Sequence, residues 1–362
     1  MKRTASTIYA IVCTLFLIGG LGVGFYFAWR GDLLDVVWYV VGFAVSLVLA
    51  PIVHELGHIV FAKANGMRLA YAKFFCFKWT LKNKKLRLGF ASPFAADETQ
   101  AVPKLGGNMQ KRAARYTLGG LIFGGVFLAV LAIVAVLFAA LGTILFVLFG
   151  ALPYAAYLFL LNVAPCIYAS GKTDMLVYVG IKKGEAAEKN MLSAMEIQGE
   201  LYAGKSFAEI DERWYTDNPV LCEDEPLFAV MLDLKYRYYL EKEEFSAAAE
   251  CLNRLAQIQP YLSAVEVEKL AGELVYMHAL GGDLESAEDS GQYCRTFLSG
   301  ESVTAKRILA TVALAGEKME ETGILLAQAE CALENEWITG VAKFEKILLS
   351  RIEKAKREEN NE

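Results

Sequence analysis

The sequence predicts an all-α protein with two parts, a membrane domain of about four transmembrane helices over residues 1–180 and a soluble domain of helical hairpins over residues 185–362. The chain of 362 residues is 55% apolar, which exceeds the usual composition of a soluble domain. Residues 1–180 hold 16 Lys and Arg against six Asp and Glu, whereas the remainder holds 20 against 35. A basic, apolar half therefore precedes an acidic, polar half.

Four apolar segments are long enough to cross about 30 Å of hydrocarbon. They cover residues 7–29, 36–62, 116–140 and 143–168. The first has no small-residue cleavage site after a short apolar core, so we expect an anchor and not a cleaved signal peptide. Residues 116–171 carry no charged side chain and exceed the length of one span, which places a turn at Gly142.

Basic residues concentrate between the second and third segments, where twelve Lys and Arg lie between Lys63 and Arg115. Because Lys and Arg are retained on the cytoplasmic side, the sequence predicts a multi-pass plasma-membrane protein with both termini in the cytoplasm. Seven cysteines without a C-x-x-C pair indicate neither a disulfide framework nor a zinc ribbon. Four of them follow residue 180, which favours a reducing compartment for the acidic half.

Two short runs in this basic loop are rich in aromatic and branched side chains. They cover Phe74–Thr80 and Leu86–Phe90 and bracket the polar stretch Lys82–Lys85. This pattern predicts a β-hairpin, with a solvated basic loop as the alternative. We expect the open edge of the hairpin to pair with an unwound substrate strand.

The second apolar segment contains the sequence HELGH, formed by His54, Glu55, Leu56, Gly57 and His58. The four-residue spacing places both imidazoles on one face of a helix, where they can share a metal ion. Two imidazoles and a carboxylate are unfavourable in an apolar helix unless they act together. The alternative is a pair of core histidines. The third histidine of the chain, His278, is expected to be a core residue.

A catalytic zinc ion needs three protein ligands and an open position for water. Glu55 and Asp174 are the acidic residues of the membrane half that lie outside its loops, and Asp174 closely follows the uncharged stretch. Asp174 is therefore the candidate third ligand. The alternative is an interfacial carboxylate paired with Lys172. Glu55, next to the first histidine, is suited to act as general base.

These elements resemble the site-2 protease family of intramembrane zinc metalloproteases. The likeness covers roughly residues 45–180 and depends on HELGH followed by Asn162, Pro165 and Asp174 in the segment LNVAPCIYASGKTDM. The resemblance implies zinc bound by two histidines and Asp174, and a role for Asn162 in holding the substrate backbone. Met175 stands where the family usually has Gly, and Gly119–Gly120 where a Gly-Pro pair is frequent.

In the acidic half, three segments resemble tetratricopeptide-like helical hairpins. They cover residues 228–260, 270–300 and 308–335, with turns near Leu240, Leu280 and Leu314. The irregular spacing of these turns departs from a strict repeat. We expect a surface for a cytosolic protein partner; the alternative is a packed helical domain with a solvated acidic face.

Two functions follow as expectations. The first is an intramembrane zinc metalloprotease that cleaves in or near the transmembrane segment of a single-span membrane protein or a remnant signal peptide. The second is a non-proteolytic membrane adaptor that keeps a zinc site and recruits partners through its helical repeats. The presence of Glu55 favours the enzyme, because a structural zinc site needs no general base. The lipid bilayer is expected to surround the membrane domain, and no nucleic acid is expected as a partner.

Overall fold

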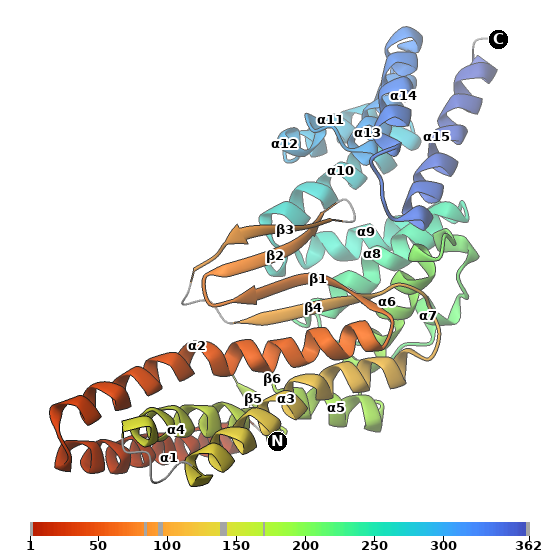
Figure 1. Cartoon of the computed structure of the whole chain (residues 1–362). Helices are drawn as coiled ribbons and strands as arrows, with labels where there is room; N and C mark the ends of the chain where they lie inside the picture. The colour runs from red at the N-terminus through yellow and green to blue at the C-terminus, as the bar shows by residue number, and fades with distance from the viewer. Residues whose placement is uncertain (1–2, 83–84, 93–96, 138–142, 169–170, 360–362) are drawn as a thin grey trace. The chain divides into compact units, whose positions relative to one another are not determined.

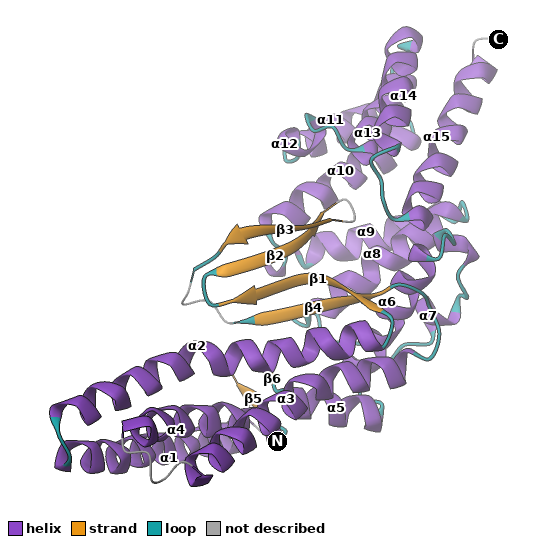
Figure 2. Ribbon diagram, in the orientation of Figure 1, coloured by secondary structure: helices purple, strands orange, loops and turns teal. Residues whose placement is uncertain are grey.

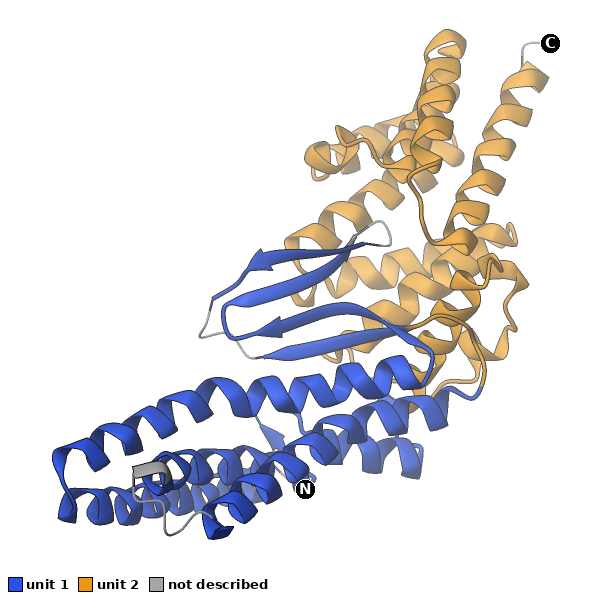
Figure 3. Ribbon diagram, viewed as in Figure 1, with its two compact units in different colours: residues 1–102, 108–188 blue, residues 103–107, 189–362 orange. Residues whose placement is uncertain are grey.

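The computed structural model describes the chain except for residues 1–2, 83–84, 93–96, 138–142, 169–170 and 360–362 (Figure 1). Helix accounts for 74% of the structure. The chain divides into two compact units, a membrane unit of residues 1–102 and 108–188 and a C-terminal unit of residues 103–107 and 189–362 (Figure 3). The predicted, mostly helical architecture with several apolar membrane helices is therefore confirmed.

Within the described part of the membrane unit, four helices are long and apolar enough to cross a bilayer. They are α1 (Arg3–Arg30), α2 (Leu33–Ala64), α3 (Met109–Leu137) and α4 (Thr143–Val163). The predicted turn at Gly142 lies outside the described residues. Helix α4 ends at Val163, before the predicted end at residue 168, because Pro165 lacks an N–H and disfavours helical backbone in the residue before it.

Glycines let α2 and α3 approach closely. A Cβ atom built on Gly57 would overlap the carbonyl oxygen of Gly119, and one built on Gly119 would lie 2.5 Å from the carbonyl oxygen of Gly57. Small residues of this kind allow membrane helices to pack backbone against backbone. The glycine of HELGH therefore sets the contact that brings α3 beside the two histidines of α2.

The segment between α2 and α3 contains a four-stranded sheet (Figure 2). Its strands are β1 (Met67–Phe74), β2 (Phe77–Lys82), β3 (Lys85–Phe90) and β4 (Glu98–Pro103), in the order β3-β2-β1-β4. The predicted hairpin is confirmed as β2 and β3, which pair antiparallel from Phe77↔Phe90 to Lys82↔Lys85. Asn83 and Lys84 lie outside the described residues. The predicted all-α class is too narrow, because the membrane unit also contains this sheet. Charged residues in β1 and β4 obscured these two strands in the sequence.

Side chains alternate between two faces of the β2–β3 hairpin. One face is apolar and includes Phe77, Trp79, Leu81, Leu86, Leu88 and Phe90. The other includes Lys78, Thr80, Lys85 and Arg87. The apolar face is not covered by protein, since Leu88 is 60% and Phe90 74% exposed. A contiguous exposed apolar face of this kind marks an interaction surface.

A short hairpin and a helix complete the membrane unit after α4. Strand β5 (Ile167–Tyr168) pairs antiparallel with β6 (Gly171–Lys172). Helix α5 (Asp174–Lys183) follows directly, with Thr173 as its N-cap and Gly184 in the left-handed conformation at its end. This arrangement fixes the start of α5 close to the end of α4.

The C-terminal unit is built mainly from consecutive helix pairs. It begins within α6 (Ala186–Tyr202), followed by α7 (Arg213–Thr216). The three pairs are α8 (Pro226–Glu241) with α9 (Phe245–Gln257), α10 (Ala264–Leu280) with α11 (Leu284–Gly291), and α13 (Val303–Ala315) with α14 (Met319–Leu333). The short α12 (Arg295–Leu298) and the long α15 (Thr339–Glu359) complete the unit.

The first helix of each pair ends in the same turn. Glu243, Gly282 and Glu317 adopt left-handed backbone with φ of 62°, 78° and 58°. The N–H group of the next residue then donates to the carbonyl five residues earlier, at 2.9 Å in all three turns. This is the Schellman ending of a helix, which usually takes Gly. The repeated geometry shows that the three pairs are locally equivalent, although two of the turns carry Glu.

A charged group is buried in the core of the C-terminal unit. Arg307 on α13 is fully buried and donates to Glu273 of α10 and Glu345 of α15, each at 2.8 Å. Tyr236 of α8 donates to Glu273 at 2.7 Å, and the guanidinium of Arg307 lies 4.2 Å from the centre of the Tyr276 ring. Arg307 thus joins α13 to α10 and α15, and Tyr236 attaches α8 to the same group through Glu273.

Replacing Arg307 with Ala is expected to destabilise the C-terminal unit by about 3–5 kcal/mol, because Glu273 and Glu345 would remain buried without their cation. Hydrogen exchange of α10 and α13 amides in the full chain measures this loss. Lys343→Ala is the control, since Lys343 pairs with Glu209 where both side chains are nearly half exposed; it should cost about 1 kcal/mol or less. Equal losses in the two variants would contradict the prediction.

Candidate metal centre

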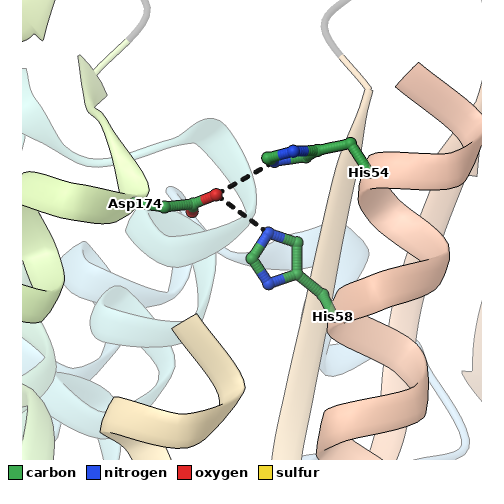
Figure 4. Close-up of side chains that lie close together, drawn as sticks. All are labelled: His54, His58 and Asp174. Atoms are coloured by element: carbon green, nitrogen blue, oxygen red, sulfur yellow. Dashed lines mark hydrogen bonds and ion pairs between the residues drawn. The ribbon is translucent and has the colours of Figure 1, made fainter. Parts of the chain in front are cut away.

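Three predicted ligands meet at one point in the membrane unit. His54 and His58 lie one turn apart on α2, and Asp174 is the first residue of α5. The Nε2 atoms of His54 and His58 lie 2.9 Å and 3.2 Å from the same Oδ2 atom of Asp174 (Figure 4). Two donor atoms bound to one tetrahedral zinc ion are roughly 3.3 Å apart. The donor types and their separations therefore fit a metal ion.

The three side chains are well shielded from water. His54 and His58 are 7% and 5% exposed, and the side chain of Asp174 is 21% exposed. Burial raises the pKa of the Asp174 carboxyl, but hydrogen bonds and charge interactions with His54 and His58 outweigh it and hold that pKa well below its usual range. These interactions favour the ionised form of Asp174, which is the form that binds a metal ion.

The backbone of α3 orients one of the imidazoles. Nδ1 of His58 lies 3.0 Å from the carbonyl oxygen of Tyr116. Because a carbonyl only accepts, Nδ1 donates to it, which leaves Nε2 as the ring nitrogen that faces Asp174 and would bind a metal ion. The hydroxyl of Tyr116 also donates to the carbonyl oxygen of Thr99 on β4, at 2.5 Å. Tyr116 thus links α2, which carries His58, to the sheet. The sequence pattern did not reveal this role.

Gly120 of α3 makes room for both imidazoles. A Cβ atom at this position would overlap Nε2 of His58 and would lie 2.7 Å from the ring of His54. In the sequence, the Gly119–Gly120 pair is a departure from the Gly-Pro pair of the family that the chain resembles. In the structure, Gly119 contacts α2, and Gly120 leaves space for the rings of His54 and His58.

Glu55 follows the first histidine and is 9% exposed. Its carboxyl lies near His54, His58 and Asp174, and near the side chain of Thr99. A buried carboxylate beside a set of metal ligands is placed to exchange a proton with a metal-bound water. Thr99 belongs to β4, so this strand of the sheet passes near the carboxylate.

Other predicted residues lie outside this group. The side chain of Asn162 on α4 donates to the carbonyl oxygen of Leu158 at 3.2 Å. Lys172 pairs with Glu188 at 2.7 Å and not with Asp174, so the structure does not support the alternative interpretation of Asp174. His278 was expected in the core, but its side chain is 38% exposed and lies 3.9 Å from Asp283. Its position at the end of α10 explains the difference.

Comparison with known proteins does not extend these observations. A scan against protein-family models and searches of curated proteins and of solved structures each gave no match. The fold and the site together define a membrane-associated helical protein with a buried group, His54, His58 and Asp174, that can hold a metal ion.

Proposed function

We propose that this chain is an intramembrane zinc metalloprotease of the site-2 type, which hydrolyses a peptide bond in or near the transmembrane segment of a membrane protein or a remnant signal peptide. The convergence of His54, His58 and Asp174 beside Glu55 carries the proposal. Two imidazoles and one carboxylate are a zinc donor set that leaves a position for water. The position of His54 and His58 on the apolar helix α2 suits a substrate within the bilayer.

The residues have distinct roles in the proposed reaction. A zinc ion held by His54, His58 and Asp174 would polarise the peptide carbonyl and lower the pKa of a bound water toward neutrality. Glu55 takes the proton from the water as it attacks the carbonyl carbon. Glu55 then delivers this proton to the amine as the C–N bond breaks. Asn162, on α4, would hold the substrate backbone, as in the resembling family.

The sheet supports access of a substrate to this site. A transmembrane helix must unwind before its carbonyls can react, because its backbone groups are hydrogen-bonded internally. Strands β3 and β4 are the two edges of the sheet. The β4 edge carries Thr99 beside Glu55, so a strand added there would lie near the ligands. This proposal differs from the expectation from the sequence, which placed the substrate on the open edge of the hairpin, now β3 at the opposite side of the sheet.

The remaining features support a plasma-membrane setting with cytoplasmic termini. Twelve basic residues between Lys63 and Arg115 favour the cytoplasmic side for this loop. The exposed apolar face of the β2–β3 hairpin would then lie in the bilayer interface, with its basic face toward water and anionic headgroups.

A second candidate function is a membrane adaptor with a retained metal site. The three equivalent helix pairs of the C-terminal unit support a tetratricopeptide-like interpretation. A pocket of about 460 Å³ lies in this unit, lined mainly by apolar side chains of α8, α9 and α10 together with Arg237, Glu266 and Lys269. A pocket of this size and composition suits part of a peptide or small ligand. It would recruit a cytosolic protein partner in either function.

Zinc analysis combined with a cleavage assay tests the proposal. The full-length protein in nanodiscs should hold about one zinc ion per chain and cleave at least one of a panel of labelled single-span substrates. A chelator should abolish cleavage, and zinc should restore it. Cleavage by metal-free protein would reject the mechanism. Bound zinc without cleavage of any substrate would favour the adaptor.

A further inference from the structure

Thr173, directly before the third ligand, is fixed on both sides. Its side chain is 4% exposed, and its hydroxyl donates to the carbonyl oxygen of Ala164 at 2.8 Å. The hydroxyl oxygen of Thr173 also accepts from the N–H of Cys166 at 3.1 Å and from the N–H of Leu176 at 3.3 Å. The N–H of Thr173 donates to the carbonyl of Cys166 at 3.0 Å. Thr173 thus holds the start of α5 against the segment that follows α4.

Lys172 provides a second attachment. Its Nζ lies 2.7 Å from Oε1 of Glu188. Glu188 is 3% exposed, and its Oε2 has no hydrogen-bond partner within the described part of the chain. Gly180 of α5 makes space for this carboxylate, because a Cβ atom there would lie 2.6 Å from the carboxyl carbon. The ion pair therefore occupies a fitted position, where loss of either charge is unfavourable.

We propose that Thr173 and the Lys172–Glu188 pair form a clamp that positions Asp174 for metal binding. Metal–ligand distances tolerate deviations of only about 0.2 Å, so the backbone before Asp174 must be held firmly. Glu188 lies in the first turn of α6, and α6 continues into the C-terminal unit from Lys189 onward. The clamp therefore makes metal affinity depend on the helix that leads into that unit.

Metal binding by variants of Thr173 tests the first attachment. Thr173→Val removes the hydroxyl and keeps the shape, whereas Thr173→Ser keeps the hydroxyl. The Val variant should bind Co²⁺ about 10- to 100-fold more weakly, as is typical when a group that orients a ligand is lost, and should change the visible spectrum of bound Co²⁺. The Ser variant should restore both. Unchanged affinity and spectrum in the Val variant would overturn the proposal.

Charge variants test the second attachment independently. Glu188→Gln should weaken Co²⁺ binding. The double exchange Lys172→Glu with Glu188→Lys, which restores an ion pair of reversed polarity, should bind Co²⁺ more tightly than Glu188→Gln. Glu200→Gln is the matched control, because Glu200 also lies on α6 but pairs with the half-exposed Lys205; it should leave binding unchanged. Equal affinity of Glu188→Gln and the parent would overturn this part of the clamp.

The inference depends on a metal ion at the proposed site but not on peptide hydrolysis. If the parent protein binds no metal, the proposed function fails. If the parent binds metal and cleaves its substrate while every clamp variant binds Co²⁺ as the parent does, only the clamp is rejected.

Discussion

Replacing Glu55 with Gln is expected to reduce peptide cleavage by a factor of about 10² to 10⁴, the contribution of a general acid–base group. Gln has the shape of Glu but cannot accept the proton of the attacking water at neutral pH. The metal content should stay the same, because Glu55 is not among the three residues whose donor atoms converge. Single-turnover cleavage of a labelled single-span substrate, alongside zinc analysis, measures both quantities.

The control for this variant is Glu185→Gln, an exposed carboxylate of the membrane unit. It should cleave at the parent rate. Cleavage by Glu55→Gln at the parent rate would remove Glu55 from the mechanism. Loss of zinc from Glu55→Gln would instead indicate a structural role for this carboxylate in the ligand set.

The membrane helices and the candidate ligands were predictable because their signals are local. A span requires an unbroken apolar stretch, and two histidines four residues apart must share a helical face. Asp174 could be proposed because acidic residues are scarce in the membrane half. The structure brings the three together, although their sequence separation gave no information about distance.

The residues that support the site were not predictable, because their roles arise from contacts between distant segments. Tyr116 acts through its backbone carbonyl, which any residue would provide. Thr173 acts through the segment that follows α4. Strand β1 contains Arg68 and Lys73, which obscure its alternation, yet Lys73 is buried against Asp97 at 2.9 Å. A pairing of this kind reverses the usual preference of a lysine for the surface.

Similar reasons apply to the C-terminal unit. The turns predicted near Leu240, Leu280 and Leu314 match the ends of α8, α10 and α13, but the left-handed backbone of Glu243 and Glu317 was not predictable, because such positions normally take Gly. Arginine usually lies at the protein surface. Arg307 lies in the core because α10 and α15 supply two carboxylates that pair with it. Tertiary contacts thus determine the conformation or burial of these residues, against the usual preferences of Glu and Arg.

Replacing Asp174 with Ala is expected to remove the metal ion together with cleavage. The two imidazoles of α2 would remain as the only protein donors of the proposed set, whereas catalytic zinc sites use three. Because loss of a residue that merely orients a ligand weakens metal binding by about 10- to 100-fold, loss of the ligand itself should weaken it by more than about 100-fold. Competition with a chromophoric chelator measures this affinity.

Asp283→Ala is the matched control, because Asp283 is also a carboxylate beside a histidine, 3.9 Å from His278, but lies in the C-terminal unit. It should keep metal binding and cleavage. The two central variants then separate the two roles: Glu55→Gln should hold zinc without cleaving, and Asp174→Ala should do neither. Full zinc retention by Asp174→Ala would require a different third ligand, and the close approach of Asp174 to both histidines would then be an ordinary buried ion pair.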